Sequence, residues 1–263
     1  VSATGRYVAF DSYAPNLVDD DTNGVADCFV RDQKSGLTER VNVSSTGEQS
    51  NGSCWGPAIS QDGQWVAFAS QATNLGGSTN GEWQVYLHNR NTSATRLVSK
   101  RYNGGQGGNK VSHDPSISKD GRWVVYESAA SDLITNDANG VRDVFLYDRT
   151  TGKNKRVSIN ANGKAGNGGS TDPAISADGK FIDFTSYARN LVEGDTNGKR
   201  DVFMYIPAKE KTLRVSVRAN GKQANGASLN ATVSGNGRFV AYQSTARNLV
   251  TADKSSNYDV FVY

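Results

Sequence analysis

The chain has 263 residues, of which 36% are hydrophobic, and 29 basic residues against 26 acidic ones leave a net charge of +3. A charge this small argues against a dedicated nucleic-acid surface, which needs clustered Lys and Arg. No apolar run reaches the roughly 18 residues of a membrane-spanning helix, and two cysteines are too few for a disulfide framework. We expect residues 1–263 to form a single domain.

A repeat of 58 residues organises the sequence. Related segments such as SQDGQWVAFAS and SKDGRWVVYES begin at equal intervals, at Ser2, Ser60, Ser118, Ser176 and Ser234. Within the first repeat, strand-like segments lie inside 2–12, at 27–32 and at 39–44, and a P-A-I-S segment at 57–60 leads into the next repeat. Each segment alternates or is fully apolar and is rich in Val, Ile, Phe and Tyr, which predicts four short strands per repeat.

The turns between these segments favour antiparallel pairing. Asp-Gly or Asn-Gly separates the first and second strands, and we expect a tight two-residue hairpin there because these residues accept positive φ. A Ser-Gly or Thr-Gly pair marks a second hairpin before the fourth strand. Four antiparallel strands, repeated at a fixed period, are the signature of a β-propeller blade.

The length of the chain does not correspond to a whole number of repeats. Five full repeats would need 290 residues, whereas the chain has 263; the first repeat lacks most of its first strand and the fifth lacks its fourth. We favour an all-β propeller of five four-stranded antiparallel blades with trimmed ends over a ring with further repeats. Because Val1 begins inside a strand-like pattern, we expect a mature or trimmed form.

The consensus P-x-I-S-x-D-G-R-x-V-x-F-x-S, followed by D-V-F-x-Y-D-R-x-T-G and R-V-S, resembles the TolB-like propeller repeat, also called the WD40-like PD40 repeat. The segments DGRWVVYES and DVFLYDRTTG match most closely, and the resemblance covers essentially the whole chain. It implies a bacterial protein that is periplasmic, extracellular or on the cell surface and that binds proteins or glycans. This chain departs from the pattern in a longer loop between the second and third strands.

That longer loop carries acids at alternate positions. In the first repeat Asp19, Asp21, Asn23 and Asp27 stand at positions 1, 3, 5 and 9 of a calcium loop of the EF-hand type. Position 12 holds Val30 in place of the bidentate Glu, so the loop is not an EF-hand and its calcium affinity would be low. The corresponding candidates in the third and fourth repeats are Asp137, Asn139 and Asp143, and Glu193, Asp195, Asn197 and Asp201.

Two interpretations of these loops stay open. Calcium would make them rigid without taking part in catalysis. Alternatively, each loop is a polar Asn-Gly turn whose last Asp bonds the backbone at the start of the third strand. The second repeat has essentially lost the carboxylates, which argues against a purely calcium-based role.

The two cysteines are predicted to lie close together. Cys28 starts a third strand and Cys54 precedes the first strand of the next repeat, and in a propeller both positions lie on one face of adjacent blades. A disulfide closing this loop would contribute about 3 kcal/mol and indicates an oxidising compartment. The alternative is two separate buried thiols.

Residues that break the repeat on that face are candidate ligand contacts. They are Trp55 and His113 at one repeat position, and Trp83, Arg142, Arg200 and Tyr258 at another. Loop tryptophans stack on sugars or anchor a protein partner, although these two could also pack only against the cysteines. Trp65 and Trp123 align with aromatic residues of the second strand, and we expect them to pack inside the fold.

These observations favour an exported, non-enzymatic binding or scaffold propeller that engages a protein partner through its loop-rich face. The first alternative is a calcium-assisted, lectin-like carbohydrate-binding propeller. The second is a polysaccharide glycosidase or lyase that uses channel carboxylates. The sequence has no G-x-S-x-G elbow, His113 beside Asp114 is a weak catalytic signal, and His88 is expected in a turn. We expect no nucleic-acid partner, and the oligomeric state is left open.

Overall fold

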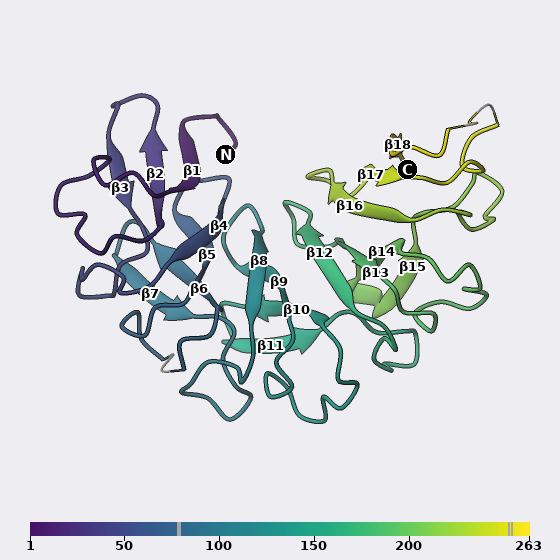
Figure 1. The fold of residues 1–263 in the computed structure, drawn as a ribbon, viewed down its shortest axis with the longest axis horizontal. Coiled ribbons are helices and arrows are strands. Elements are labelled where there is room, and N and C mark those ends of the chain that lie inside the picture. The colour runs from purple at the N-terminus through teal and green to yellow at the C-terminus, as the bar shows by residue number, and fades with distance from the viewer. Residues whose placement is uncertain (78–79, 252, 254) are drawn as a thin grey trace. The chain divides into compact units, whose positions relative to one another are not determined.

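The computed structural model describes residues 1–77, 80–251, 253 and 255–263. Its regular structure is nearly all strand, arranged in five antiparallel sheets of three, four, four, four and three strands (Figure 1). A 3-10 turn, η1 (Pro207–Lys209), interrupts this pattern. Among the described residues, no helix has the length and apolar character that crossing a membrane requires. The predicted four-strand repeat, with a strand missing from each terminal sheet, is confirmed.

The strands follow the repeat in chain order. The first sheet contains β1 (Tyr7–Ser12), β2 (Asp27–Asp32) and β3 (Thr38–Arg40). The second contains β4 (Cys54–Ile59), β5 (Trp65–Ser70), β6 (Gln84–Asn89) and β7 (Ala94–Leu97). The third contains β8 (Ser112–Ile117), β9 (Trp123–Ser128), β10 (Asp143–Asp148) and β11 (Lys153–Arg156). The fourth contains β12 (Ser170–Ile175), β13 (Ile182–Ser186), β14 (Asp201–Ile206) and β15 (Lys211–Arg214), and the fifth β16 (Ser228–Val233), β17 (Val240–Ser244) and β18 (Asp259–Val262).

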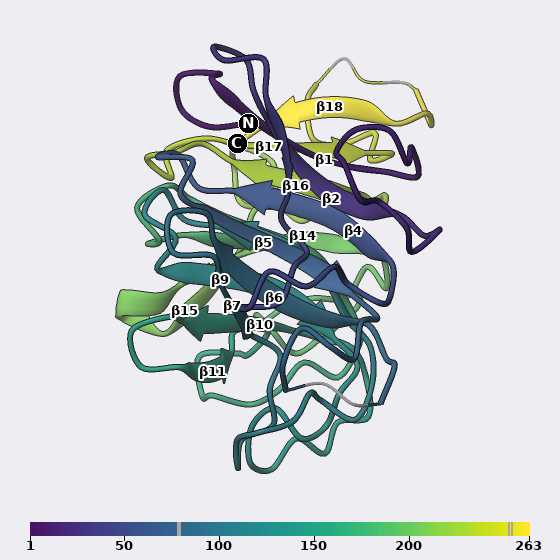
Figure 2. The same ribbon diagram turned by 90° about the vertical axis from the view of Figure 1, so that its left-hand side faces the viewer.

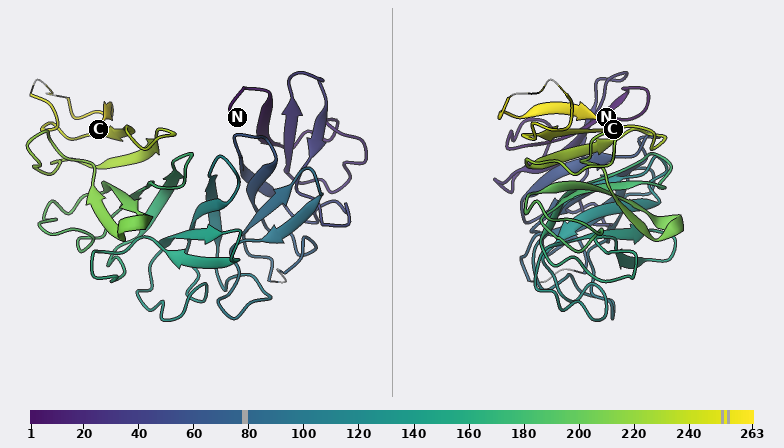
Figure 3. Two further views of the ribbon diagram at one scale, coloured as in Figure 1. Left: turned by 180° about the vertical axis from the view of Figure 1, so that it is seen from behind. Right: turned by 90° about the vertical axis from the view of Figure 1, so that its right-hand side faces the viewer.

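The chain divides into two compact units. The first unit comprises residues 1–138 and 146–155, and the second comprises 139–145 and 156–263. In the first unit β4 and β5 lie beside β8, and Figure 2 shows β4, β5 and β6 running alongside one another. In the second unit β13 lies beside β16. Figure 3 shows from behind the long loops that connect the strands of each sheet.

The middle strands of the sheets form the core. Every residue of β5 and of β6 is buried, which matches their short, largely apolar runs bounded by turn residues. Across these two strands the rings of Phe68 and Tyr86 stack with centroids 5.8 Å apart. Phe184 and Phe203 stack in the same way between β13 and β14, at 5.9 Å. In each of these two sheets, a stacked aromatic pair at the same repeat position therefore helps to hold the two middle strands together.

The connection between the first and second strands is longer than predicted. Five residues join Ile59 at the end of β4 to Trp65 at the start of β5, so the turn is not a two-residue hairpin. The backbone N–H of Trp65 donates to the hydroxyl of Ser60 at 2.9 Å, which closes the turn. In the next repeat the turn glycine Gly121 has φ +66, and a Cβ there would overlap the ring of Trp65. The guanidinium of Arg149 covers that ring at 4.2 Å, so Trp65 packs inside the fold as expected.

A β-bulge recurs in the first strand of the second, third, fourth and fifth sheets. The register shifts after Trp55 in β4, after His113 in β8, after Thr171 in β12 and after Leu229 in β16. The residue that follows each of these has positive φ; in β8 this is Asp114, at 51°. Left-handed backbone is uncommon for residues other than glycine, and a bulge redirects the neighbouring side chains. The fold thus has a built-in irregularity at the position of Trp55 and His113.

Candidate functional site

A disulfide joins Cys28 and Cys54, whose Cα atoms are 5.6 Å apart. Both residues are fully buried, and the bridge ties the start of β2 to the start of β4. At the equivalent junction between the third and fourth repeats the residues are Val144 and Ser170, so the bridge is specific to the first junction.

The acidic loops contain arginine ion pairs. In the first repeat Nη1 of Arg40 lies 3.4 Å from Oδ1 of Asp21 and 3.5 Å from Oδ2 of Asp27. In the third repeat Nη1 of Arg156 lies 3.2 Å from Oδ2 of Asp143. These arginines come from the ends of β3 and β11, and sequence reasoning missed them. They bring positive charge to the carboxylates at the positions where we expected calcium.

The fourth repeat has the same arrangement. Nη1 of Arg214 lies 3.4 Å from Oδ1 of Asp195 and 3.7 Å from Oδ2 of Asp201. Burial raises the pKa of both carboxyl groups, and the charge of Arg214 acts in the opposite direction. The arginine therefore offsets part of the cost of burying two acids.

The second repeat lacks both the acid and the arginine of this ion pair. Gln84 stands at the position of Asp143, and Leu97 stands at the position of Arg156. The hydroxyl of Ser99 donates to Oε1 of Gln84 at 2.6 Å, just as Ser158 donates to Oδ1 of Asp143 at 2.5 Å. The acid and the arginine are lost together, so they behave as one ion-pair unit.

The loop asparagines have a structural part in this arrangement. Nδ2 of Asn23 donates to Oδ1 of Asp27 at 3.0 Å and to the carbonyl of Ser50 at 3.0 Å, which ties the loop to the connection after β3. Asn139 and Asn197 bond their own aspartates, Asp143 and Asp201, at 2.7 and 2.9 Å.

The first-position acids of the predicted calcium loops behave differently. Asp19 and Glu193 are exposed, whereas Asp137, which stands at the third loop position of the third repeat, is partly buried. The structure therefore groups the acids at the third and ninth loop positions around an arginine in the first and fourth repeats. Calcium binding by these loops stays a prediction.

A cavity of about 320 Å³ lies in the first unit, and we call it the tryptophan cavity. Its lining residues are Trp55, Ala69, Trp83, Val111, His113 and Asp114. Trp55 is 52% exposed although it belongs to a strand. Three of the predicted ligand contacts thus line one surface hollow, with apolar walls and an acid at its edge.

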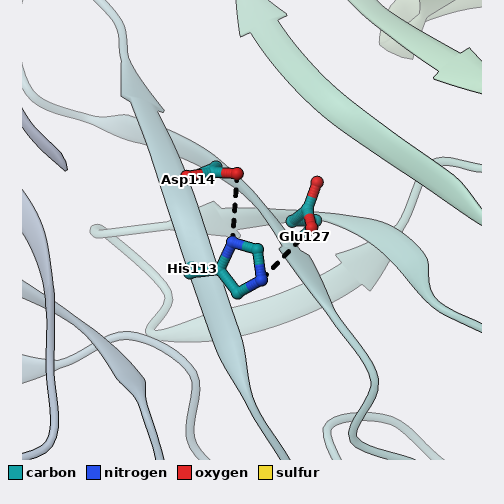
Figure 4. Close-up of side chains that lie close together, drawn as sticks. All are labelled: His113, Asp114 and Glu127. Carbon is teal, nitrogen blue, oxygen red and sulfur yellow. Dashed lines mark ion pairs between the residues drawn. The ribbon is translucent and has the colours of Figure 1, made fainter. Parts of the chain in front are cut away.

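His113 lies between two carboxylates beside this cavity (Figure 4). Its Nδ1 is 3.0 Å from Oδ2 of Asp114, and its Nε2 is 3.4 Å from Oε1 of Glu127. Glu127 lies on β9 directly opposite His113 on β8. The Glu127 side chain is 2% exposed, the His113 side chain 26%. A buried carboxylate needs a compensating charge or hydrogen bonds, and the imidazole faces it.

Sequence reasoning missed Glu127. It belongs to the segment DGRWVVYES, which reads as a core strand, and it takes the place of Ala69 and Thr185 in neighbouring repeats. Comparing the repeats at this position, as was done for Trp55, would have revealed it.

The other predicted contacts belong to the second unit and do not line the tryptophan cavity. The guanidinium of Arg200 stacks on the ring of Tyr187 at 4.7 Å. The backbone carbonyl of Arg142 accepts a hydrogen bond from Ser170 at 2.8 Å. Tyr258 is 53% exposed.

The second histidine has an internal role. His88 was predicted in a turn, but it lies on β6, is buried, and its Nδ1 is 2.8 Å from the hydroxyl of Thr95. Burial, followed by the charge of Arg90, lowers the pKa of His88 to about 4. The prediction was wrong because a single-residue shortening of the preceding loop displaces the repeat alignment.

No protein-family model matches this chain, and no curated protein matches it. Solved structures are similar to it. TolB from Acinetobacter baumannii gives a TM-score of 0.56 at 18% identity, over 99% of this chain and 51% of that protein. A TolB of Agrobacterium tumefaciens gives 0.57 at 17% identity, over 99% and 78%. A prolyl endopeptidase gives 0.51 at 15% identity, over 84% of this chain and 29% of that protein.

This chain folds as a TolB-like β-propeller. The five sheets are its blades, as the repeat predicted, and the resemblance noted in the sequence is confirmed at the level of the fold. The chain spans about half the length of the Acinetobacter baumannii protein, at 51%. In the first unit, Trp55, Trp83, His113 and Glu127 differ from the residues at the same positions of the other repeats, whereas Asp114 recurs as Asp172 in the fourth repeat.

Proposed function

We propose that this propeller is a non-enzymatic binding module of an exported bacterial protein, and that it engages a protein partner at the tryptophan cavity. The observation that carries the proposal is the pairing of half-exposed Trp55 with Trp83 in one hollow. Large aromatic side chains at the centre of a pocket supply much of the energy in protein recognition. The likeness to TolB-like propellers supports a binding role over a catalytic one.

Comparison with Trp65 supports a role in recognition. Trp65 is buried and covered by Arg149, as a residue that serves the fold should be. Trp55 has the same bulk but exposes half of its surface, at a strand position that holds histidine, threonine or leucine in the other repeats. The fold does not require tryptophan at this position.

The disulfide supports export. Bonds of this kind persist in oxidising compartments such as the periplasm or the cell exterior. The Cys28–Cys54 bridge is buried and joins neighbouring sheets, which suits a permanent structural link.

A displayed library of random peptides, selected on the immobilised propeller, tests the proposal. We expect enriched peptides whose binding is lost in Trp55→Ala and Trp83→Ala but kept in Tyr102→Ala, which removes an exposed aromatic outside the cavity. Each substitution of a central anchor should weaken binding by at least about 2 kcal/mol, or thirtyfold. Enriched peptides that bind equally well to all three variants would contradict the proposal.

Carbohydrate binding is the second candidate, because the Asp114 carboxylate lies beside the two tryptophans. Aromatic faces stack on the apolar face of a sugar ring, and a carboxylate accepts hydrogen bonds from its hydroxyl groups. A glycan array probed with the same variants distinguishes the two candidates, since retention of a glycan that requires Trp55 and Asp114 would favour the second.

A further inference from the structure

We propose that His113, Asp114 and Glu127 bind a divalent transition-metal ion of the zinc class at the edge of the tryptophan cavity. The proposal rests on the geometry of these three side chains and does not depend on the identity of the partner.

The ligand atoms suit such an ion. One imidazole nitrogen and one oxygen from each carboxylate all lie within 4.8 Å of one another. In a tetrahedral zinc site, ligand atoms at about 2.0 to 2.2 Å from the ion lie about 3.4 Å from one another. Metal binding therefore requires the half-exposed Asp114 side chain to rotate toward the ion. Calcium prefers six to eight oxygen ligands, whereas the imidazole favours zinc, copper or nickel.

The scaffold that holds these side chains is rigid. His113 and Glu127 are directly opposed residues of two paired strands, β8 and β9. The bulge in β8 places Asp114 in left-handed backbone, with φ 51°, and its side chain turns back toward the His113 ring (Figure 4). Metal sites on strands are held more precisely than sites on loops.

Burial of Glu127 gives the site its electrostatic basis. Its side chain is 2% exposed, and the attraction between a buried carboxylate and a cation is screened only weakly. A divalent ion between Glu127 and Asp114 would be attracted by both carboxylates. Three protein ligands leave coordination positions open, as in zinc sites that keep a water or a bound group. Because His113 and Asp114 line the tryptophan cavity, the open positions are accessible from it.

The other repeats show that the fold does not need this group. In the fourth repeat Thr171, Asp172 and Thr185 occupy the three equivalent positions on β12 and β13, with the same bulge and the same positive φ. The blade thus accepts threonine in place of both His113 and Glu127, which supplies substitutions that the architecture already tolerates.

Zinc titration of the full chain by calorimetry tests the proposal. We expect one saturable site in the native protein. Loss of an outer partner of a metal ligand costs 10- to 100-fold in affinity. Loss of a direct ligand, in His113→Thr or Glu127→Thr, should therefore weaken zinc binding by at least about 100-fold. Asp172→Asn, at the equivalent position of the fourth repeat, should leave the affinity unchanged.

A measurement on the native chain is independent of how well the variants fold. The protein has two histidines, so the imidazole nitrogens of each can be followed separately by NMR. Zinc should shift the ring resonances of His113 and leave those of buried His88 unchanged. Absence of saturable binding, or binding that survives His113→Thr, would overturn the proposal and leave His113 as a bridge between two carboxylates.

Discussion

Nη1 of Arg156 lies 3.2 Å from Oδ2 of Asp143, and the Asp143 side chain has no exposed surface. The pair joins the end of β11 to the start of β10, and the hydroxyl of Ser158 donates to the other carboxylate oxygen at 2.5 Å. The same acid and arginine recur in the first and fourth repeats, and in each repeat another side chain donates a hydrogen bond to the acid. The donor is the carboxamide of Asn42 in the first repeat and the hydroxyl of Ser216 in the fourth. In these three repeats the unit links the start of the third strand of the repeat to the end of its fourth strand.

Arg156→Leu should destabilise the fold strongly. It leaves the Asp143 charge buried without its cation, and breaking a buried pair in this way costs about 3 to 5 kcal/mol. Chemical denaturation followed by circular dichroism measures the loss. The double variant Asp143→Gln with Arg156→Leu recreates the Gln84 and Leu97 pair of the second repeat, and we expect it to recover most of the stability. A double variant as unstable as the single one would show that the two residues do not act as a unit.

Calcium should affect the native protein less than a variant without the arginine. Arg40 already brings positive charge to Asp21 and Asp27, so calcium would have to displace it. In Arg40→Gln the two carboxylates and the side-chain oxygen of Asn23 could coordinate a calcium ion without competition from the arginine. We therefore expect a larger calcium-dependent rise in Tm, relative to EGTA, in Arg40→Gln than in the native chain. Asp21→Ala in the Arg40→Gln background should abolish the rise, and a rise of equal size in native and variant proteins would contradict the role given to Arg40.

The sequence predicted the elements well because the repeat supplies five independent versions of each. The segment DVFLYD, read as a strand from its pattern alone, is β10 in full, from Asp143 to Asp148. Comparison of repeats also selected Trp55, Trp83 and His113, which the structure places around one cavity. These residues stand out because the fold does not dictate them.

What the sequence did not predict depends on non-local pairing. Arg40 reaches back across 13 residues to Asp27, and its R-V context reads as ordinary strand sequence. Glu127 meets His113 through strand register, and the bulge that brings Asp114 into the group has no distinctive residue, since Gly56, Asp172 and Asn230 also fit it. Clusters of side chains from different strands can be identified only when the pairing and register of those strands are known.

Asp183 should make stability depend on pH. It lies fully buried on β13, and within the described part of the chain neither carboxylate oxygen has a hydrogen-bond partner. Burial raises its pKa to about 8, whereas an unfolded Asp titrates near about 3.9. Between these values the folded state keeps a proton that the unfolded state has lost. The free energy of unfolding should therefore fall by up to about 1.4 kcal/mol per pH unit as pH rises from 4 to 8, and level off above pH 8.

Asp183→Ala isolates this contribution. The first, second and fifth repeats have alanine at the same position, so the substitution suits the blade. We expect the variant to be more stable than the native protein at pH 9 and to lose this part of the pH dependence. Denaturation midpoints measured from pH 4 to pH 9 for both proteins provide the comparison. Parallel curves for native protein and Asp183→Ala would show that Asp183 does not carry the effect.

Removing the disulfide should destabilise the chain without changing its fold. The bridge closes a loop across a sequence separation of 26, and a cross-link over such a loop contributes about 3 kcal/mol by restricting the unfolded chain. Cys28→Val with Cys54→Ser places at this junction the residues found between the third and fourth repeats, Val144 and Ser170, so packing is disturbed as little as possible. We expect the double variant to unfold at lower denaturant concentration than the native protein and to be insensitive to reductant. The native protein in reductant should approach the midpoint of the variant once the buried bridge opens, and equal midpoints for oxidised native protein and double variant would mean that the bridge contributes nothing to stability.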